Sequence, residues 1–288
     1  SDYRGGGGLY GPANEIYLKV GDKTLPLSGV WKYKVSAANT DFDFVEFGPN
    51  SYPSMLYNAM VNPLLHLNIR GVIWYQGENN TNRAAEYFDL FPAMINDWRG
   101  KWGKELPFYW VQLANYMEPV AEPGESLWAQ VRAAQTQTLS LPHTGQAVII
   151  DIGEAADIHP KNKQDVGLRL AKHALCKDYG FSDMECESPM AKTARRIEDK
   201  VVIQFDHVAD GLTVKDKYGY LKSFAVAGSD GVYHWVQAKL SGKDRVVLSC
   251  PDISEPLSVR YAWGDNPDDA NLYNSAGLPA TPFEMKIE

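Results

Sequence analysis

The chain has 288 residues, of which 44% are hydrophobic and 22% charged, and its formal net charge is −8. That length and hydrophobic content predict one or two folded domains and exclude wholesale disorder. The acidic balance argues against a nucleic-acid partner, because phosphate binding requires a basic face. No apolar stretch is long enough to span a bilayer, so we predict no membrane partner, and the N-terminus carries no leader pattern.

The N-terminal part, residues 1–48, is predicted to be a linker with a β-hairpin insertion. Four consecutive glycines at 5–8 have too much conformational freedom for the interior of a helix or strand. Residues 14–35 alternate apolar and polar side chains around Gly21 and Asp22, which predicts a strand, a turn and a second strand. The polar segment 36–53 is predicted to be a loop.

Residues 49–183 show the alternation of helices and strands that is typical of an α/β fold. Buried, unalternating strands separated by amphipathic helices predict a parallel sheet with covering helices. The first helix contains Pro63, which is expected to interrupt or bend it. Strands are predicted at 71–76, 106–114 and 146–151, and helices at 54–69, 84–98, 126–139 and 162–176, with Ser126 as an N-cap.

Residues 184–288 are predicted to form a β-rich C-terminal domain. Short apolar runs such as KVVIQFD, KSFAVAG, DRVVLSC and LSVRYAW alternate with turn residues, which is typical of antiparallel sheets. These runs need cover, so we expect the region to pack against the preceding core rather than to be tethered to it.

Two polar clusters follow predicted strands, at QGENN (76–80) and DIGEAADIHP (151–160). Ligands bind at the carboxyl ends of strands in open parallel sheets. We therefore predict that the two clusters lie close together at one edge of the sheet and form one site.

The second cluster contains an Asp two residues before a His, which suits a catalytic imidazole. Asp157 could orient His159, because a general base needs its far nitrogen held by a carboxylate. The alternative is that Asp157 only caps the loop and His159 is exposed. A hard-cation site built from acidic residues and His159 is a weaker possibility, because no spacing is diagnostic, and we predict no metal and no cofactor. Its ligands would be Glu78, Asp151, Glu154, Asp157 and His159.

The first cluster supplies amide groups that could face a developing oxyanion. Gly77 would let a substrate approach the backbone closely. A simple polar turn is the alternative, but the carboxylate of Glu78 beside Trp74 and Tyr75 needs a partner or a role.

No nucleophile is evident in the sequence. There is no G-x-S-x-G motif, and the serines considered for this role occupy turns, loops or helix starts (Ser28, Ser36, Ser51, Ser54, Ser126 and Ser140). The three cysteines are Cys176, Cys186 and Cys250, an odd number without a C-x-x-C pair. One bridge between Cys176 and Cys186 and buried free thiols are both possible readings.

Six blocks of the chain resemble the sialate O-acetylesterases, a branch of the SGNH-type carbohydrate esterases. They are LYNAMVNPLL, GVIWYQGENN, FYWVQLANYM, WAQVRAAQ, DIHPKNKQDVGLRLA and VRYAWGDNPDDANLYNSAGLPATPF. The resemblance implies a flavodoxin-like SGNH hydrolase core, here incomplete. It also implies removal of acetyl esters from sialic acid or related sugars by Ser–His–Asp chemistry, in the periplasm or outside the cell.

By motif match, the resemblance makes His159 the general base and Asp157 its orienting acid, although many SGNH enzymes place that Asp three residues before the His. The Q-G-E-S-N block of the family is matched by Gln76, Gly77, Glu78 and Asn80, near the oxyanion hole and the substrate, and Asn79 replaces the usual Ser. Arg132 and Gln135 match an R-x-x-Q helix motif and are expected to support the substrate loops.

The family's G-Q-S-N-M block, which carries the serine, has no counterpart in the chain. We therefore expect the nucleophile to come from an N-terminal part of the same protein, in cis or as a separate chain, and the chain alone to be inactive. A non-catalytic glycan-binding protein that retains the cleft is the alternative, with aromatic side chains stacking on sugars. The candidates are Trp235, Tyr261, Trp263 and Tyr273.

Overall fold

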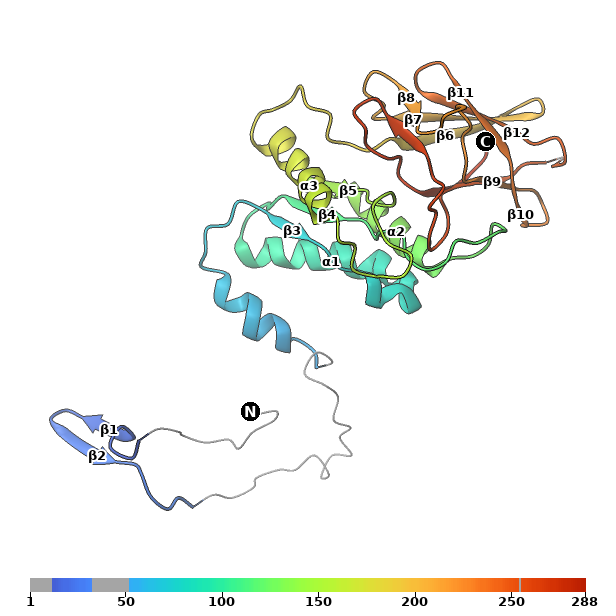
Figure 1. Cartoon of the computed structure of the whole chain (residues 1–288). Helices are drawn as coiled ribbons and strands as arrows, with labels where there is room; N and C mark the ends of the chain where they lie inside the picture. Colours follow the sequence, from blue (N-terminus) through green and yellow to red (C-terminus); the bar gives the residue numbers. More distant parts are fainter. Residues whose placement is uncertain (1–11, 33–51, 254) are drawn as a thin grey trace. The chain divides into compact units, whose positions relative to one another are not determined.

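The computed structural model describes residues 12–32, 52–253 and 255–288 (Figure 1). The chain divides into two compact units, Ser1–Pro63 and Leu64–Glu288. The glycine run at 5–8 and most of the loop predicted at 36–53 lie outside the described residues. The predicted domain bounds at 48 and 183 stay predictions.

The first unit contains the predicted hairpin. Strands β1 (Tyr17–Val20) and β2 (Lys23–Pro26) pair antiparallel around a turn in which Gly21 has a φ of 58°. The helix predicted at 54–69, with an interruption or bend at Pro63, is shorter and irregular: the chain makes a π-helical turn, η3 (Tyr57–Val61), and then a 3-10 turn, η4 (Asn62–Leu64). Pro63 has no N–H to donate, which agrees with the interruption of the helix expected at this residue.

The second unit begins with a parallel sheet in the order β3-β4-β5, formed by β3 (Val72–Trp74), β4 (Phe108–Val111) and β5 (Thr144–Ala147). This confirms the predicted parallel sheet. The third strand begins two residues earlier than predicted and ends at Ala147, because its partner strand β4 ends at Val111. Residues 148–150 remain buried beyond the sheet.

Helices cover both faces of β4. Phe108 and Trp110 point into a core shared with α1 (Ala84–Trp102) and α2 (Leu127–Gln137), whereas Tyr109 and Val111 point toward α3 (Lys163–Asp178). This alternation places the central strand between two helical layers, as a buried parallel strand requires. Short 3-10 turns, η5 (Glu78–Arg83) and η6 (Thr138–Ser140), precede α1 and follow α2. Among the described helices, none has the length and apolar composition needed to cross a bilayer.

Two helix ends show how the sequence sets the boundaries. The hydroxyl of Ser126 accepts a hydrogen bond from the backbone N–H of Ala129 at 2.9 Å, which confirms the predicted N-cap. Helix α1 continues through Gly100, beyond the predicted end at 98, and stops at Gly103, whose φ of 61° only glycine adopts readily.

The β-rich C-terminal region contains two four-stranded antiparallel sheets, ordered β10-β9-β13-β15 and β11-β12-β7-β6, and a small pair, β14-β8. Side chains from both large sheets form one core, which includes Ile203, Phe205, Val226 and Val259. The strands are β6 (Met190–Ile197), β7 (Lys200–Asp206), β8 (Leu212–Val214), β9 (Phe224–Ala227), β10 (Tyr233–Trp235), β11 (Gln237–Ser241), β12 (Arg245–Ser249), β13 (Ser258–Tyr261), β14 (Leu272–Asn274) and β15 (Phe283–Lys286).

The C-terminal region contacts the α/β core through residues 264–266, the GDN of the last sequence block. The Asp265 carboxylate accepts a hydrogen bond from Ser126 Oγ at 2.6 Å, and Asn115 Nδ2 donates to Asn266 Oδ1 at 2.9 Å. At another point Tyr273 OH donates to Asp151 at 3.2 Å. These bonds join the end of β4 and the start of α2 to the β-rich region, so the region packs against the core.

Candidate active site

The two polar loops line one pocket beyond the carboxyl ends of the parallel strands. Its volume is about 330 Å³. Among the residues that line it are Gln76 and Glu78 from the first loop and His159 from the second. The predicted convergence is therefore confirmed for these residues. Asn79 of the QGENN cluster also lines the pocket, and sequence reasoning missed three further lining residues, which are Tyr75, Ile158 and Lys163.

The first loop is held by a network around Gln76. Its side-chain amide donates to Asn80 Oδ1 at 2.7 Å, and Tyr87 OH donates to its carbonyl groups at 3.1 and 3.2 Å. The amide of Gln76 is thus already bound within the loop. Asn79, at the position where the family usually has Ser, also lines the pocket.

The structure gives a reason for glycine at position 77 that differs from the predicted one. It is buried with a φ of 150°, and a Cβ there would lie 3.3 Å from Leu113 and from the Gln135 side chain. Gly77 therefore permits close packing of the loop on α2 and β4. It is absent from the pocket lining, as is Asn80, and the expected approach of a substrate to Gly77 stays a prediction.

The second loop is anchored at several points before it reaches His159. Asp151 makes a two-pronged ion pair with Arg169 at 2.6 and 2.8 Å. Gly153 N–H donates to Asn115 Oδ1 at 2.6 Å, and a Cβ on Gly153 would lie only 2.1 Å from the Asn115 carbonyl oxygen. Glycine is therefore required at position 153 for this close approach.

Glu154 closes the same loop by accepting hydrogen bonds from the backbone and the side chain of Lys161, at 3.0 and 2.8 Å. These bonds hold the pKa of the exposed Glu154 carboxyl below its usual value. Since Asp151 and Glu154 are both bound to basic residues, they do not join Glu78, Asp157 and His159 in one cluster. The hard-cation reading of these five residues has no support in the described part of the chain.

The contacts between Asp157 and His159 are compatible with both roles considered from the sequence. Asp157 Oδ1 accepts the backbone N–H of His159 at 2.9 Å, which is a loop cap, and the same oxygen lies 3.7 Å from His159 Nδ1. The His159 side chain is 87% exposed. The ring thus stands free in the pocket with Nδ1 toward the carboxylate, and Nε2 is left for another group.

Tyr75 forms an apolar wall of the pocket. Burial, together with the nearby Glu78 carboxylate, raises the pKa of Tyr75 to about 12. The phenol is therefore protonated at neutral pH and is a poor nucleophile. Lys163 Nζ lies 4.9 Å from the centre of its ring, which places a cation at the entrance of the pocket.

Gln135 joins the chain at the carboxyl ends of β3 and β4. Its Oε1 accepts the backbone N–H of Leu113 at 3.0 Å, and its Nε2 lies 3.3 Å from the carbonyl oxygens of Gln76 and Val111. Gln135 thus positions the first loop without lining the pocket.

Arg132 is fully buried and binds backbone carbonyls on two parts of the chain. It donates to Leu113 and Ala114 at the end of β4, and to Gly264 and Asp265 in the C-terminal region, at 2.5 to 2.9 Å. Burial lowers the pKa of Arg132 to about 9, so the side chain is still a cation at neutral pH. Its position supports the loops through the packing of the C-terminal region rather than through the pocket.

We predict that Arg132→Met destabilises the 288-residue chain by about 3–5 kcal/mol, because a thioether cannot donate to the buried carbonyl oxygens that Arg132 binds. Arg83→Met is the matched control, since Arg83 is 54% exposed and pairs only with Glu86, and its expected effect is within about 0.5 kcal/mol. Urea unfolding measures both variants. If Arg132→Met lowered the free energy of unfolding as little as the control does, the bonds from Arg132 to these carbonyl oxygens would not stabilise the chain as predicted.

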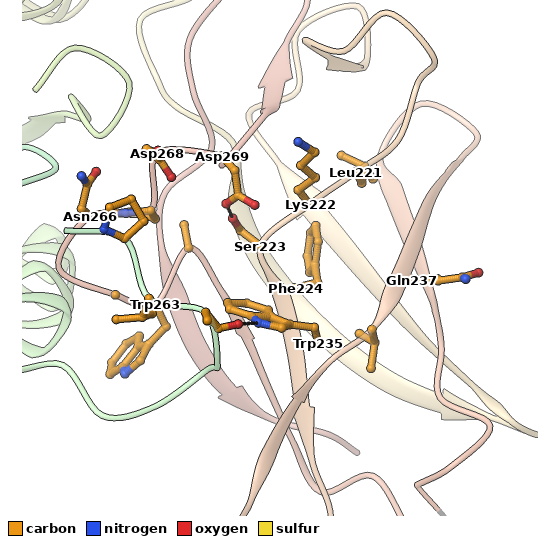
Figure 2. A pocket seen from close by; sticks show the side chains of 17 residues that line it. Leu221, Lys222, Ser223, Phe224, Trp235, Gln237, Trp263, Asn266, Asp268 and Asp269 are labelled. Atoms are coloured by element: carbon orange, nitrogen blue, oxygen red, sulfur yellow. Dashed lines mark hydrogen bonds between the residues drawn. The ribbon is translucent and has the colours of Figure 1, made fainter. Parts of the chain in front are cut away.

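A second pocket, of about 400 Å³, lies where the C-terminal region meets residues 119–121 (Figure 2). Trp235 is 42% exposed and donates from its indole N–H to the Ala121 carbonyl at 2.8 Å. Ser223 and Asp269 are hydrogen-bonded to each other on its lining (Figure 2). Of the four aromatics proposed for sugar stacking, Trp235 and Trp263 line this pocket, whereas Tyr261 and Tyr273 are buried.

Comparisons with known proteins agree with this architecture. A family model described as "Carbohydrate esterase, sialic acid-specific acetylesterase" matches residues 35–176. Sialate O-acetylesterase of Rattus norvegicus is 30% identical over 268 residues, which are 83% of this chain and 48% of that protein. The human protein is 29% identical over 262 residues, or 82% of this chain and 49% of its own length.

The crystal structure of a carbohydrate acetylesterase from Xanthomonas citri superposes with a TM-score of 0.77 at 44% identity, covering 82% of this chain and 55% of that one. The fold is that of an SGNH-type carbohydrate esterase. Within that class, the chain is similar to the sialic acid-specific acetylesterase family, whose model matches residues 35–176. It spans about half the length of the curated relatives that it matches.

Proposed function

We propose that the chain is the histidine-bearing part of an esterase that removes O-acetyl groups from sialic acid or related acetylated sugars. The observation that carries this proposal is the single pocket lined by both the QGENN loop and His159. The similarity to this family supports the class of substrate, and the relatives named above are sialate O-acetylesterases.

In the proposed reaction, a serine hydroxyl attacks the acetyl carbonyl while His159 Nε2 accepts its proton. The imidazolium returns that proton to the sugar oxygen, which leaves as a hydroxyl group, and water then releases acetate by the same route. Asp157, 3.7 Å from Nδ1, orients the ring and stabilises its charge. Asn79 faces the pocket and is placed to donate to the developing oxyanion.

The serine is proposed to come from a segment outside these 288 residues. The described lining of the pocket contains no serine, threonine or cysteine. In the flavodoxin-like strand order 2-1-3-4-5, the third strand pairs with the first strand of the fold. If the three described strands are the last three of that order, a further strand belongs beside the one at their outer edge. In the described sheet β3 has a free edge, and Ile73 on it is 71% exposed. Both features support the docking of a strand that carries the nucleophile at this edge.

Saccharide binding without catalysis is the second candidate, and the pocket beside Trp235 favours it. Exposed tryptophan faces bind sugar rings, and the neighbouring carboxylates of Asp268 and Asp269 offer acceptors for hydroxyl groups. An esterase could also use this pocket to bind a sugar unit of its substrate that lies away from the acetyl group. The two candidate functions are therefore distinguished by whether acetate is released.

The test uses a longer protein in which a G-Q-S-N-M segment precedes these residues. We expect it to release acetate from O-acetylated sialic acid and from p-nitrophenyl acetate, and to leave the N-acetyl amide intact. Acetate is measured by a coupled assay, and binding of the sugar by calorimetry. Tight binding of the acetylated sugar without any acetate release would reject the esterase and favour the binding protein.

A further inference from the structure

His173 is a buried polar side chain that the proposed reaction does not use. It lies on α3, is 1% exposed, and stacks on Tyr109 with ring centres 5.6 Å apart. One ring nitrogen, Nε2, lies 3.0 Å from the carbonyl oxygen of Gln146. The other, Nδ1, is buried and has no hydrogen-bond partner among the described residues.

The tautomer of His173 follows from these contacts. A carbonyl oxygen only accepts, so Nε2 carries the proton and Nδ1 presents a lone pair. Histidines that bind metals typically donate their other N–H to a carbonyl or carboxylate in this way, which fixes the ring. A buried lone pair without a donor is costly unless something binds it.

Two further ligand atoms lie next to this ring. A ring nitrogen of His173, Sγ of Cys186 and a carboxylate oxygen of Glu187 are all within 4.8 Å of one another. Cys186 is 5% exposed. The thiol of Cys176 lies beside that of Cys186. Cys176 is on α3, three residues after His173. Imidazole, thiolate and carboxylate are the ligands that zinc takes in proteins.

The charges around the cluster suit a divalent cation. Lys177 pairs with Glu187 Oε1 at 2.5 Å and also donates to the Thr144 carbonyl at 2.6 Å. Two thiolates and one carboxylate carry three negative charges, and Lys177 with a divalent ion carries three positive ones. A tetrahedral zinc ion with bonds of ~2.0–2.3 Å needs ligand atoms about 3.5 Å apart. Rotation of the side chains can bring the three ligand atoms from their present separations, up to 4.8 Å, to this distance.

We propose that His173, Cys186 and Glu187 bind a zinc-class ion, with Cys176 as the fourth ligand. Four protein ligands close the site, so its role is structural: the ion ties α3 to the segment that leads into the C-terminal β-rich region. Each thiol loses its proton to the solvent as the metal binds. This inference is independent of the proposed esterase function.

The experiment uses the 288-residue chain, reduced, stripped with a chelator and then titrated with Zn²⁺ or Co²⁺. We expect one metal per chain by elemental analysis, thiolate-to-cobalt absorption, and a rise in melting temperature of about 5–10 °C at a hundredfold excess over Kd. Cys186→Ser and Glu187→Gln are expected to weaken binding at least tenfold, and His173→Ala to abolish it.

Cys250→Ser is the control, because Cys250 is buried in the core of the β-rich region, away from the cluster. It should bind the metal as the wild type does. The proposal is overturned by a reduced chain that retains no metal and shows no cobalt–thiolate band. The proposal is also overturned if Cys186→Ser and Glu187→Gln both bind the metal as tightly as the wild type does. A Cys176–Cys186 disulfide that persists in reductant would overturn it too.

Discussion

In a longer protein that carries the serine segment, His159→Ala should lower kcat for acetyl-ester hydrolysis by about 10⁴–10⁶-fold. Without the imidazole, the serine loses the group proposed to accept its proton, and Tyr75 cannot replace it because burial and the nearby Glu78 carboxylate keep its phenol protonated. The side chain of His159 is 87% exposed, so its removal should change the free energy of unfolding by no more than about 0.5 kcal/mol. Turnover of p-nitrophenyl acetate and urea unfolding measure the two effects.

Two matched variants sharpen this test. Asp157→Asn retains an oxygen that can accept the His159 backbone N–H, now seen at 2.9 Å, while removing the charge that faces Nδ1. A loss of about 10⁴-fold in kcat would assign the carboxylate to catalysis rather than to the loop cap alone. His234→Ala alters an exposed histidine on β10 and should leave kcat unchanged. If His159→Ala kept more than a tenth of the activity, His159 would not be the base.

The 288-residue chain by itself should hydrolyse acetyl esters at the background rate, about 10⁴–10⁶-fold below the longer protein. The described lining of the pocket offers His159 no hydroxyl or thiol group to activate. Part of an esterase oxyanion hole also comes from the backbone N–H next to the nucleophile, and that group would be missing too. Initial rates of both proteins with p-nitrophenyl acetate measure the difference.

A fluorophosphonate probe, which labels activated serines, gives an independent readout for the same prediction. The longer protein should be labelled in its G-Q-S-N-M segment, and the 288-residue chain should remain unlabelled. Ordinary esterase rates in the short chain, lost on mutation of one of its own serines such as Ser140, would show that the nucleophile lies within these residues.

The local patterns of the sequence determined the class of fold and the place of the site. Apolar strands separated by amphipathic helices predicted the parallel sheet, and Ser126 marked a helix start, because these features depend on side chains a few residues apart. The polar clusters after two strands predicted a shared pocket, since parallel strands end at one edge. The motif blocks pointed to the esterase family.

Only the tertiary structure decided which polar side chains face the pocket and which are hydrogen-bonded within the fold. Gln76 is bound by Asn80 and Tyr87, and Arg132 reaches a carbonyl 132 residues away, at Gly264. Likewise, His173 meets Cys186 and Glu187 only because the chain turns back beside α3. Motif spacing records neighbours along the chain, whereas a side chain's hydrogen-bond partners depend on the packing of distant segments, which local patterns do not encode.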